Sequence, residues 1–438
     1  MLDAGVGISI KKDGYEAGRN AAKQALENMN TKPKLAILAV DSLSRRKFNY
    51  NKILQGIREE LGPDVILIGS TANGIIVNDR FALRSVGLML IGGDLSIDAS
   101  FNEPKSRLEY EKIAEIIYQK SISLEPKDNR FLLMFQDGAK FPPKMLAKQK
   151  MLNSRVVALM SGIVRRFFKK VLDDMEENGM GMPSLQKLLE TLYSKGWTYP
   201  VIGNISTDLR DYDSVEFFND TVGTDNVVGT ILSGFGNTKF GFGFSAGAES
   251  TGKTCTITKN IGNMILKIDG NPAILGFCDA AGLNKEALYE LKSAGNVNYY
   301  NMFGTREIQG NNSIIHLTGT ITNPDLENLV MTGYPFDRVP KKVEIFQSNM
   351  DVMHKTAREC VNQALSGIAE PKFLLGFDCA MRFFAYGDNL SKIIKTINDE
   401  IGKDIPKMIF GAGGEIFANK DIDLYENNIT FITLAGGE

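Results

Sequence analysis

The chain has 438 residues, of which 43% are hydrophobic and 23% charged, and this composition is typical of a globular protein with two or three domains. Its formal net charge of −2 offers no basic field to nucleic-acid backbones or anionic membranes, so we expect no nucleic acid and no membrane as partners. No apolar run approaches the roughly 20 residues that cross a bilayer, and the N-terminus lacks an apolar signal core. We therefore predict a cytoplasmic protein.

The first predicted elements alternate between helices and buried strands. Residues 14–30 place small residues at helical spacing, which indicates a helix that approaches a sheet closely. The run LAILAV after Pro33 has no polar alternation, as expected of a strand covered on both sides. Residues 51–61 place apolar residues on one helical face before Gly62 and Pro63 end the helix. The two faces comprise Ala17, Ala21, Ala22, Ala25, Ile53, Leu54, Ile57 and Leu61.

The same order of signals occurs three times: a buried strand, a helix, a second strand ending in a small-residue turn, and a third strand. The strands read LAILAVDS, DVILIGSTANGIIV and SVGLMLIGG, then FLLMFQDG, TYPVIGNISTDL and NVVGTILSG, then FLLGFDCA, PKMIFGAGGEIF and NNITFITLAGG. These copies are longer and less regular than solenoid units. We predict an α/β fold of duplicated strand–helix–strand modules, which form mixed sheets covered by helices in two halves.

Between and after these copies lie further predicted elements. Residues 141–183 interleave Lys and Arg with apolar pairs, which fits either a helix with a solvated basic face or a partner-binding helix. Residues 239–244 alternate Phe with Gly, as in a strand, and residues 351–365 read as a helix. The turn at 270–272 is the predicted boundary between an N-terminal domain, 1–270, and a C-terminal domain, 271–438.

Gly247, Gly252, Lys253 and Thr254 match the expression for a nucleotide phosphate loop. Such a loop requires a helix directly after it, because the first-turn amides and the helix dipole hold the phosphate. The segment CTITKNIGNMILKIDG instead alternates like a β-hairpin. We therefore read the motif as a chance match, although Asp41 and Asp137 end strands and keep a magnesium-nucleotide alternative open.

Catalytic and metal-binding patterns are otherwise sparse. His316 lies in an alternating run and His354 in a helical one, with neither metal spacing nor a nucleophile partner, so each fits a structural histidine or, alternatively, a haem or metal ligand. The four cysteines lack CxxC spacing and are expected as buried, reduced thiols: Cys255, Cys278, Cys360 and Cys379. We predict no enzyme activity, no bound metal and no cofactor. The alternative that stays open is an enzyme of unknown class.

The repeats place turns of small residues at three strand ends. In α/β sheets ligands collect beyond strand ends, where small residues expose backbone groups and leave room. A glycine at such a place can equally serve only to make a tight turn. If the three turns face a common cleft, the candidate ligand-binding residues are Gly69, Ser70, Thr71, Asn73, Gly203, Asn204, Gly411, Gly413, Gly414 and Glu415.

Asp378, Cys379 and Arg382 follow the first strand of the last copy and complete the candidate site. They lie beside Glu415 if neighbouring strands pair. Arg382 would then either form an ion pair with Glu415 or bind a ligand carboxylate or phosphate through its two parallel N–H groups. Both alternatives remain open from the sequence.

These residues carry a resemblance to a known family. GYEAGRNAAKQAL, LAILAVDS and VILIGSTANG resemble the N-terminal half of FIST proteins (F-box and intracellular signal transduction), and FLLGFDCAMR, IFGAGGEIF and NNITF resemble the C-terminal half. Family members show a Cys and an Arg three positions apart, matched by Cys379 and Arg382, and a Gly-Glu-Ile, matched at Gly414 to Ile416. In the first copy Gly74, Ile75 and Ile76 stand there without the acidic residue.

The resemblance implies a sensory, ligand-binding module without established catalysis, in many members fused to kinases, chemoreceptors or nucleotide cyclases. The sequence ends in the last predicted strand, so we expect signalling through a separate protein such as a kinase. We predict a cytoplasmic module that binds a small molecule, an amino acid or related metabolite, for signal transduction. The alternatives are a haem-binding gas sensor that uses His316, His354 or a cysteine, and an enzyme of unknown class that uses the strand-end turns.

Overall fold

The computed structural model describes residues 1–42, 48–104, 108–125, 127, 129–138, 140, 185–208, 213–261, 264–284, 286, 301–309, 312–319, 330–331, 339–420 and 430–438. The chain divides into two compact units. The first comprises Met1–Ala139, Pro183–Ser245 and His354–Glu438, and the second comprises Lys140–Met182 and Ala246–Met353. The first unit therefore contains segments from both ends of the chain.

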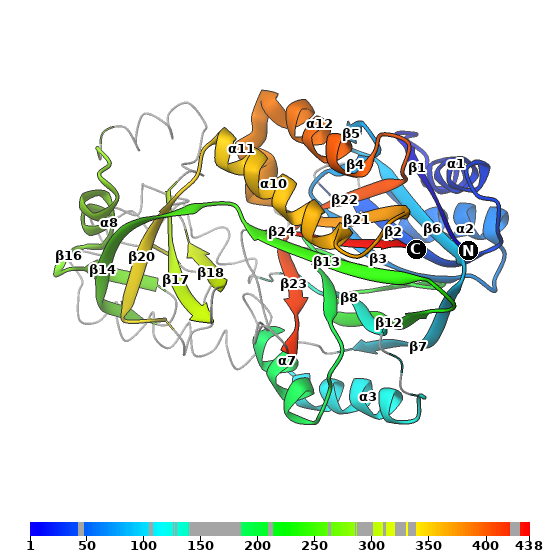
Figure 1. Cartoon of the computed structure of the whole chain (residues 1–438), viewed down its shortest axis with the longest axis horizontal. Helices are drawn as coiled ribbons and strands as arrows, with labels where there is room; N and C mark the ends of the chain where they lie inside the picture. The colour runs from blue at the N-terminus through cyan, green and yellow to red at the C-terminus, as the bar shows by residue number, and fades with distance from the viewer. Residues whose placement is uncertain are drawn as a thin grey trace. The chain divides into compact units, whose positions relative to one another are not determined.

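The first unit consists of three modules with one topology, shown in Figure 1. Module one comprises β1 (Leu2–Ser9), α1 (Gly14–Glu27), β2 (Pro33–Asp41), α2 (Tyr50–Leu61), β3 (Ile66–Ala72), β4 (Ile75–Val77), β5 (Arg80–Ala82) and β6 (Val86–Gly93). Module two comprises β7 (Leu95–Pro104), α3 (Tyr110–Ile122), β8 (Phe131–Gln136), α7 (Leu185–Ser194), β9 (Val201–Ile205), β10 (Glu216–Phe218), β11 (Thr221–Gly223) and β12 (Asn226–Gly234). Module three comprises β13 (Lys239–Ala246), α10 (Met350–Leu365), β21 (Pro371–Cys379), α11 (Ala380–Tyr386), α12 (Leu390–Ile401), β22 (Lys407–Ala412), β23 (Gly414–Ala418) and β24 (Thr430–Gly437).

In every module the central strand has the same two neighbours. The strands β2, β8 and β21 pair in parallel with β3, β9 and β22, and antiparallel with β6, β12 and β24. A parallel neighbour requires a crossover, and each crossover contains a described helix: α2 in module one, α7 in module two and α12 in module three. The predicted α/β fold of repeated modules with mixed sheets is therefore confirmed.

The modules exchange their short edge strands. Strand β10 of module two pairs with β3 of module one, β23 of module three pairs with β9 of module two, and β4 of module one pairs with β22 of module three. The resulting sheet orders are β1-β6-β2-β3-β10-β11, β23-β9-β8-β12-β7 and β13-β24-β21-β22-β4-β5. Each sheet is thus completed by another module, in a closed cycle.

Helices cover one side of each sheet. The small-residue face predicted for α1 is confirmed, since Ala17, Ala21, Ala22 and Ala25 are buried against β2, β3 and β6 together with the predicted apolar face of α2. Asp13 caps α1 by accepting the N–H of Glu16. In the second sheet α3 and α7 cover β8, β9 and β12. In the third, Thr433 of β24 donates to the backbone carbonyl of Cys360 in α10 at 3.0 Å.

The opposite side of the sheets forms the interior of this unit. Phe135 of β8 packs edge-on against Phe377 of β21 and tilted against Phe410 of β22, with ring centroids 5.9 and 5.6 Å apart. Gly87 of β6 lies against Ile75 and Met408 of the third sheet, which leaves no space for a side chain at that point. The three sheets therefore share one core.

The described helix and strands of the second unit lie between β13 and α10 in the sequence. Its elements are β14 (Glu249–Ile261), β15 (Met264–Ile268), β16 (Asn271–Pro272), α8 (Ala273–Ala281), β17 (Asn301–Gln309), β18 (Asn312–Gly319), β19 (Val330–Met331) and β20 (Lys342–Gln347). Its core forms where α8 packs Ile274 and Phe277 against Ile265 and Ile268 of β15.

The segment around Lys253 behaves as predicted for a hairpin. Lys253 and Thr254 lie inside β14, which pairs antiparallel with β15. Gly252 has φ of +73°, a conformation that glycine adopts readily. Because a strand follows the motif, it cannot supply the helix N-terminal amides that a phosphate loop requires.

Three further predictions have different outcomes. The strand at 239–244 and the helix at 351–365 are confirmed as β13 and α10. The predicted basic helix at 141–183 lies outside the described residues, and the boundary between domains 1–270 and 271–438 stays a prediction. Within the described part of the chain, no helix combines the length and apolarity needed to cross a bilayer.

Candidate functional site

The three predicted turns come together inside the first unit. The backbone N–H of Asn73 donates to the carbonyl of Gly411 at 2.8 Å, and Gly411 N–H donates to Gly74 at 2.9 Å. The N–H of Gly413 donates to Ile205 at 2.9 Å. The side-chain amide of Asn73 donates to the hydroxyl of Thr207 at 2.9 Å. The turns of modules one, two and three are therefore joined directly to one another.

The glycines of these turns serve this close packing. A Cβ built on Gly69, Gly203 or Gly411 would lie 2.0, 1.8 or 2.1 Å from a backbone oxygen, of Leu38, Met134 or Asn73 respectively. On Gly413 and Gly414 it would lie 2.7 and 2.8 Å from side-chain carbons of Thr207 and Ile205. Close packing within the protein is therefore enough to explain these five glycines, without any ligand.

A row of buried polar residues crosses from the first sheet to the second. The amide of Asn204 on β9 donates to the hydroxyl of Ser70 on β3 at 2.9 Å. Glu415 on β23 stands directly opposite Asn204, and Glu216 on β10 stands directly opposite Ser70, so each pair shares one side of its sheet. All four residues have 0% relative exposure. Thr71 also takes part, since its hydroxyl accepts the N–H of Val215 at 3.2 Å.

Sequence reasoning missed Glu216. Its carboxylate accepts a hydrogen bond from Ser206 and another from the N–H of Asn226 at 3.4 Å. The available signal was a single acidic residue between Val215 and Phe217, where an exposed loop carboxylate would have polar neighbours. Only the exchange of β10 between modules shows that this position matches Glu415.

Glu415 is only half satisfied. Its Oε2 accepts the N–H and the hydroxyl of Thr430 at 3.0 and 3.2 Å, while Oε1 and the neighbouring Asn204 Oδ1 have no hydrogen-bond partner in the described chain. Burial raises the pKa of Glu415 to about 8, although the hydrogen bonds from Thr430 and the charge of Arg382 oppose this rise. This rise favours the protonated form of Glu415 at neutral pH. Burial also raises the pKa of the adjacent Cys379 thiol.

Arg382 forms an ion pair with Asp378 rather than with Glu415. Its Nε donates to Asp378 Oδ1 at 2.6 Å, and the hydroxyl of Tyr386 donates to Oδ2 at 2.6 Å. Burial opposes the charge on Arg382, but the carboxylate of Asp378 outweighs it and raises the pKa of Arg382 above its ordinary value. The Arg382 side chain is 1% exposed, yet Nη1 and Nη2 have no partner in the described chain.

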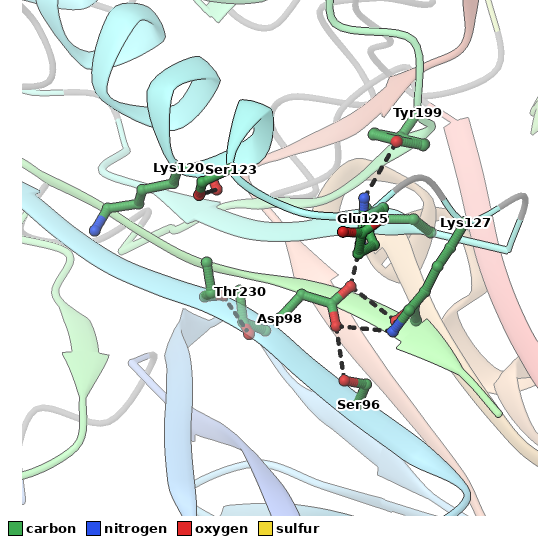
Figure 2. Close-up of polar contacts among 11 residues, drawn as sticks. Ser96, Asp98, Lys120, Ser123, Glu125, Lys127, Tyr199 and Thr230 are labelled. Carbon is green, nitrogen blue, oxygen red and sulfur yellow. Dashed lines mark hydrogen bonds and ion pairs between the residues drawn. The ribbon is translucent and has the colours of Figure 1, made fainter.

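A second buried arginine in the same unit provides the comparison. Arg130 has a side chain that is also 1% exposed, and its Nε donates to Asp98 at 2.9 Å. Its Nη1 donates to the Tyr199 hydroxyl at 3.2 Å and its Nη2 to the Glu125 carbonyl at 2.7 Å. Figure 2 shows Ser96 and Lys127 bonded to the Asp98 carboxylate, with Tyr199 farther from it. All three guanidinium nitrogens of Arg130 thus donate hydrogen bonds within the protein. The outer end of Arg382, its Nη1 and Nη2, has no such partner in the described chain.

Asp98 also differs from Glu415 in its ionisation. Burial alone would raise the pKa of Asp98, but hydrogen bonds from Ser96, Ser233, Arg130 and Lys127 together lower it. With four hydrogen-bond donors, the Asp98 carboxylate needs no ligand to balance its charge. Arg382, by contrast, retains the donor fork that binds the two oxygens of a carboxylate side by side.

Among the described residues, the histidine and cysteine side chains belong to no cluster that could hold a metal ion. His354 in α10 lies with Nδ1 2.8 Å from the hydroxyl of Thr396. His316 lies in β18, where its backbone pairs with Thr305, and its side chain is outside the described residues. All four cysteines are buried and free of disulfides, as predicted.

Comparisons with known proteins agree with the sequence resemblance. The model of the FIST N domain matches residues 43–271, which is more than half of the chain. A search of curated proteins found no match. The chain therefore belongs to the FIST family, whose domain is associated with signal transduction.

Proposed function

We propose that this protein is a sensory module that binds a small carboxylate-bearing metabolite, such as an amino acid, at the carboxyl edge of β21 and β22. The association of the FIST domain with signal transduction supports the sensory part. The observation that carries the ligand part is the outer end of Arg382, where two buried nitrogens have no partner. Leaving buried donors unsatisfied costs roughly 1–3 kcal/mol per group, which a ligand would recover.

The charge balance favours a ligand that also carries an amine. Arg382 and Asp378 together are neutral, so a bare carboxylate would add an uncompensated negative charge to a buried site. Glu415 Oε1 and Asn204 Oδ1 are two acceptors without partners on directly opposed positions. The charge of Arg382 lowers the pKa of Glu415, so the two groups lie within electrostatic reach of each other. An ammonium group on those oxygens would balance the ligand carboxylate.

The rest of the proposal concerns the signal. We propose a cytoplasmic protein in which ligand binding shifts the population between two arrangements of this edge, and a separate signalling protein such as a kinase reads the change. The exchanged strands support such a readout. Glu415 stands on a strand that belongs to module three but completes the sheet of module two, so a ligand held there would act on two modules together.

A thermal-shift screen tests the proposal. Wild-type protein is heated with each proteinogenic amino acid and, in parallel, with matched carboxylates that lack the amine. A ligand at a hundred times its Kd should stabilise the protein by about 2.7 kcal/mol and raise the melting temperature by several degrees. The amine-free analogues should give much smaller shifts.

Two variants with matched controls connect a positive response to Arg382. Arg382→Lys keeps the charge but removes the two-nitrogen fork, and Arg382→Met with Asp378→Asn removes both charges without leaving either unpaired. Both should abolish the ligand response. The control variants are Arg130→Lys, and Arg130→Met with Asp98→Asn. They should lower the stability of the protein but retain the ligand response. A response that survives in the Arg382 variants, or a flat screen across the whole panel, would contradict the proposal.

A further inference from the structure

A second buried polar group stands unpaired in the middle module. Gln136 ends β8 and has 0% relative exposure. Its backbone carbonyl is well used, since it accepts the N–H and the hydroxyl of Ser206 at 2.8 and 3.0 Å. Its side-chain Oε1 and Nε2 both lack a partner in the described chain. A flip of the Gln136 amide, which exchanges Oε1 and Nε2, would give neither atom a hydrogen-bond partner.

The other two modules contain a residue at the position that matches Gln136. Ser70, Asn204 and Phe410 occupy matching places, since each pairs both with an exchanged strand and with a central strand, at Ala39, Phe135 and Phe377. The next residues along the central strands are Val40, Gln136 and Asp378. Val40 is apolar and buried in a hydrophobic cluster. Asp378 is engaged by Arg382 and Tyr386.

Gln136 alone among these three is polar without an internal partner. Its register partners on the neighbouring strands are Ile205 and Val227, whose side chains lie on the same side of the sheet and belong to the apolar cluster under α3 and α7. A buried water needs two to four polar partners, and these neighbours offer none. A ligand that brings its own polar group would therefore satisfy the amide.

We propose that Gln136 marks a second ligand site, which takes a neutral ligand with an amide group. A carboxamide offers one acceptor for Nε2 beside one donor for Oε1, and so satisfies both halves of the Gln136 amide. A carboxylate would oppose its two oxygens to Oε1, and an ammonium would leave Nε2 without an acceptor. The apolar side chains of Ile205 and Val227 also disfavour a charged ligand beside the amide. This inference does not depend on a ligand at Arg382.

Side-chain NMR of the full-length protein tests the proposal. Protein labelled with ¹⁵N-glutamine is titrated with acetamide and nicotinamide as probes and with acetate and methylammonium as controls. The Gln136 side-chain signals are assigned by their loss in Gln136→Leu. They should shift in a saturable manner with the amides and stay in place with the charged probes. Signals from Gln24, whose side chain bonds Asn20 and Ile8, should not move.

A thermal measurement on the same variants completes the test. The amide probes should raise the melting temperature of wild type and of Gln24→Leu, and this shift should vanish in Gln136→Leu. Gln136→Leu without ligand should melt at the wild-type temperature or above, since an unsatisfied amide is removed. Unchanged Gln136 signals at saturating probe, an equal shift with acetate, or an amide response retained in Gln136→Leu would each overturn the proposal.

Discussion

Glu415 and Arg382 are both buried, but burial changes their ionisation differently. Arg382 keeps its charge because Asp378 lies 2.6 Å away. Glu415 has only neutral donors from Thr430, and burial raises its pKa to about 8. A carboxyl group whose pKa lies near neutrality in a signalling protein makes both stability and ligand binding depend on pH.

The first prediction concerns stability. The ordinary glutamate pKa is 4.5, so between pH 4.5 and 8 the unfolded chain loses the Glu415 proton while the folded protein keeps it. Stability contributed by this residue therefore falls as pH rises through that window. Glu415→Gln keeps a neutral side chain and should become more stable than wild type by a few kcal/mol at pH 8, at about 1.4 kcal/mol per pKa unit.

Urea unfolding at pH 5 and pH 8 checks this sign. The two proteins should differ little at pH 5 and most at pH 8. The exposed Glu370, with a side chain 67% accessible, supplies the control Glu370→Gln, which should track wild type at both values. A Glu415→Gln protein that gains no stability relative to wild type as pH rises would show that Glu415 ionises normally.

The second prediction concerns binding. An ammonium group beside Glu415 favours the ionised carboxylate, so binding of an amino acid should release a fraction of a proton below pH 8. Affinity should then rise with pH between 6 and 8, by up to about tenfold per unit. Calorimetry in two buffers of different ionisation enthalpy measures the released proton directly. Glu415→Gln should bind without proton release, and a wild-type protein that releases none would exclude ionised Glu415 as the amine's partner.

At the scale of the elements, the close approach of strands depends on glycines without side chains. Gly203 on β9 is the most closely packed of the described glycines, since a Cβ there would lie 1.8 Å from the Met134 carbonyl of β8. Gly203→Ala should separate the two parallel strands and destabilise the protein by about 2–4 kcal/mol. Gly367→Ala is the control: φ is +81° but nothing lies within 4 Å, so it should cost only about 1 kcal/mol.

Chemical denaturation of both glycine variants measures this difference. Because Gly203 adjoins Asn204, the first variant should also weaken any amino-acid response, whereas Gly367→Ala should retain it. Equal stabilities for the two variants would show that β8 and β9 can move apart at little cost.

Local patterns predicted much of the fold but little of the site. Helical spacing of Ala17, Ala21 and Ala25 was enough for α1, and alternation of Thr and apolar residues was enough to recognise β14 as a strand. The pairing of Glu415 with Asn204, and of Glu216 with Ser70, arises from strands exchanged between modules. Such long-range register leaves no local periodicity. The ion pair of Asp378 with Arg382, by contrast, joins residues only four positions apart and could have been weighed from the sequence.

At the scale of the whole molecule, the exchanged strands make the modules interdependent. Residues 1–270 contain β4, which completes the third sheet, but lack β22, with which it pairs. Residues 271–438 contain β23 but lack β9. Each half therefore leaves a sheet edge and apolar surface uncovered.

The prediction is that neither half folds alone and that the two assemble when produced together. Separately expressed fragments 1–270 and 271–438 should be insoluble or show no cooperative melting, while co-expressed fragments should co-purify as a one-to-one complex. A fragment that melts cooperatively as a monomer would show that strand exchange is not required for folding.

The central claim is that the outer end of Arg382 receives a ligand carboxylate. A high-resolution crystal structure with the best ligand from the thermal screen tests it most directly. We predict continuous density for a carboxylate within hydrogen-bond distance of both Nη1 and Nη2, with the amine near Glu415 and Asn204. Density that instead shows these two nitrogens bonded to the chain's own carbonyls or to ordered water, with the ligand elsewhere, would contradict the account.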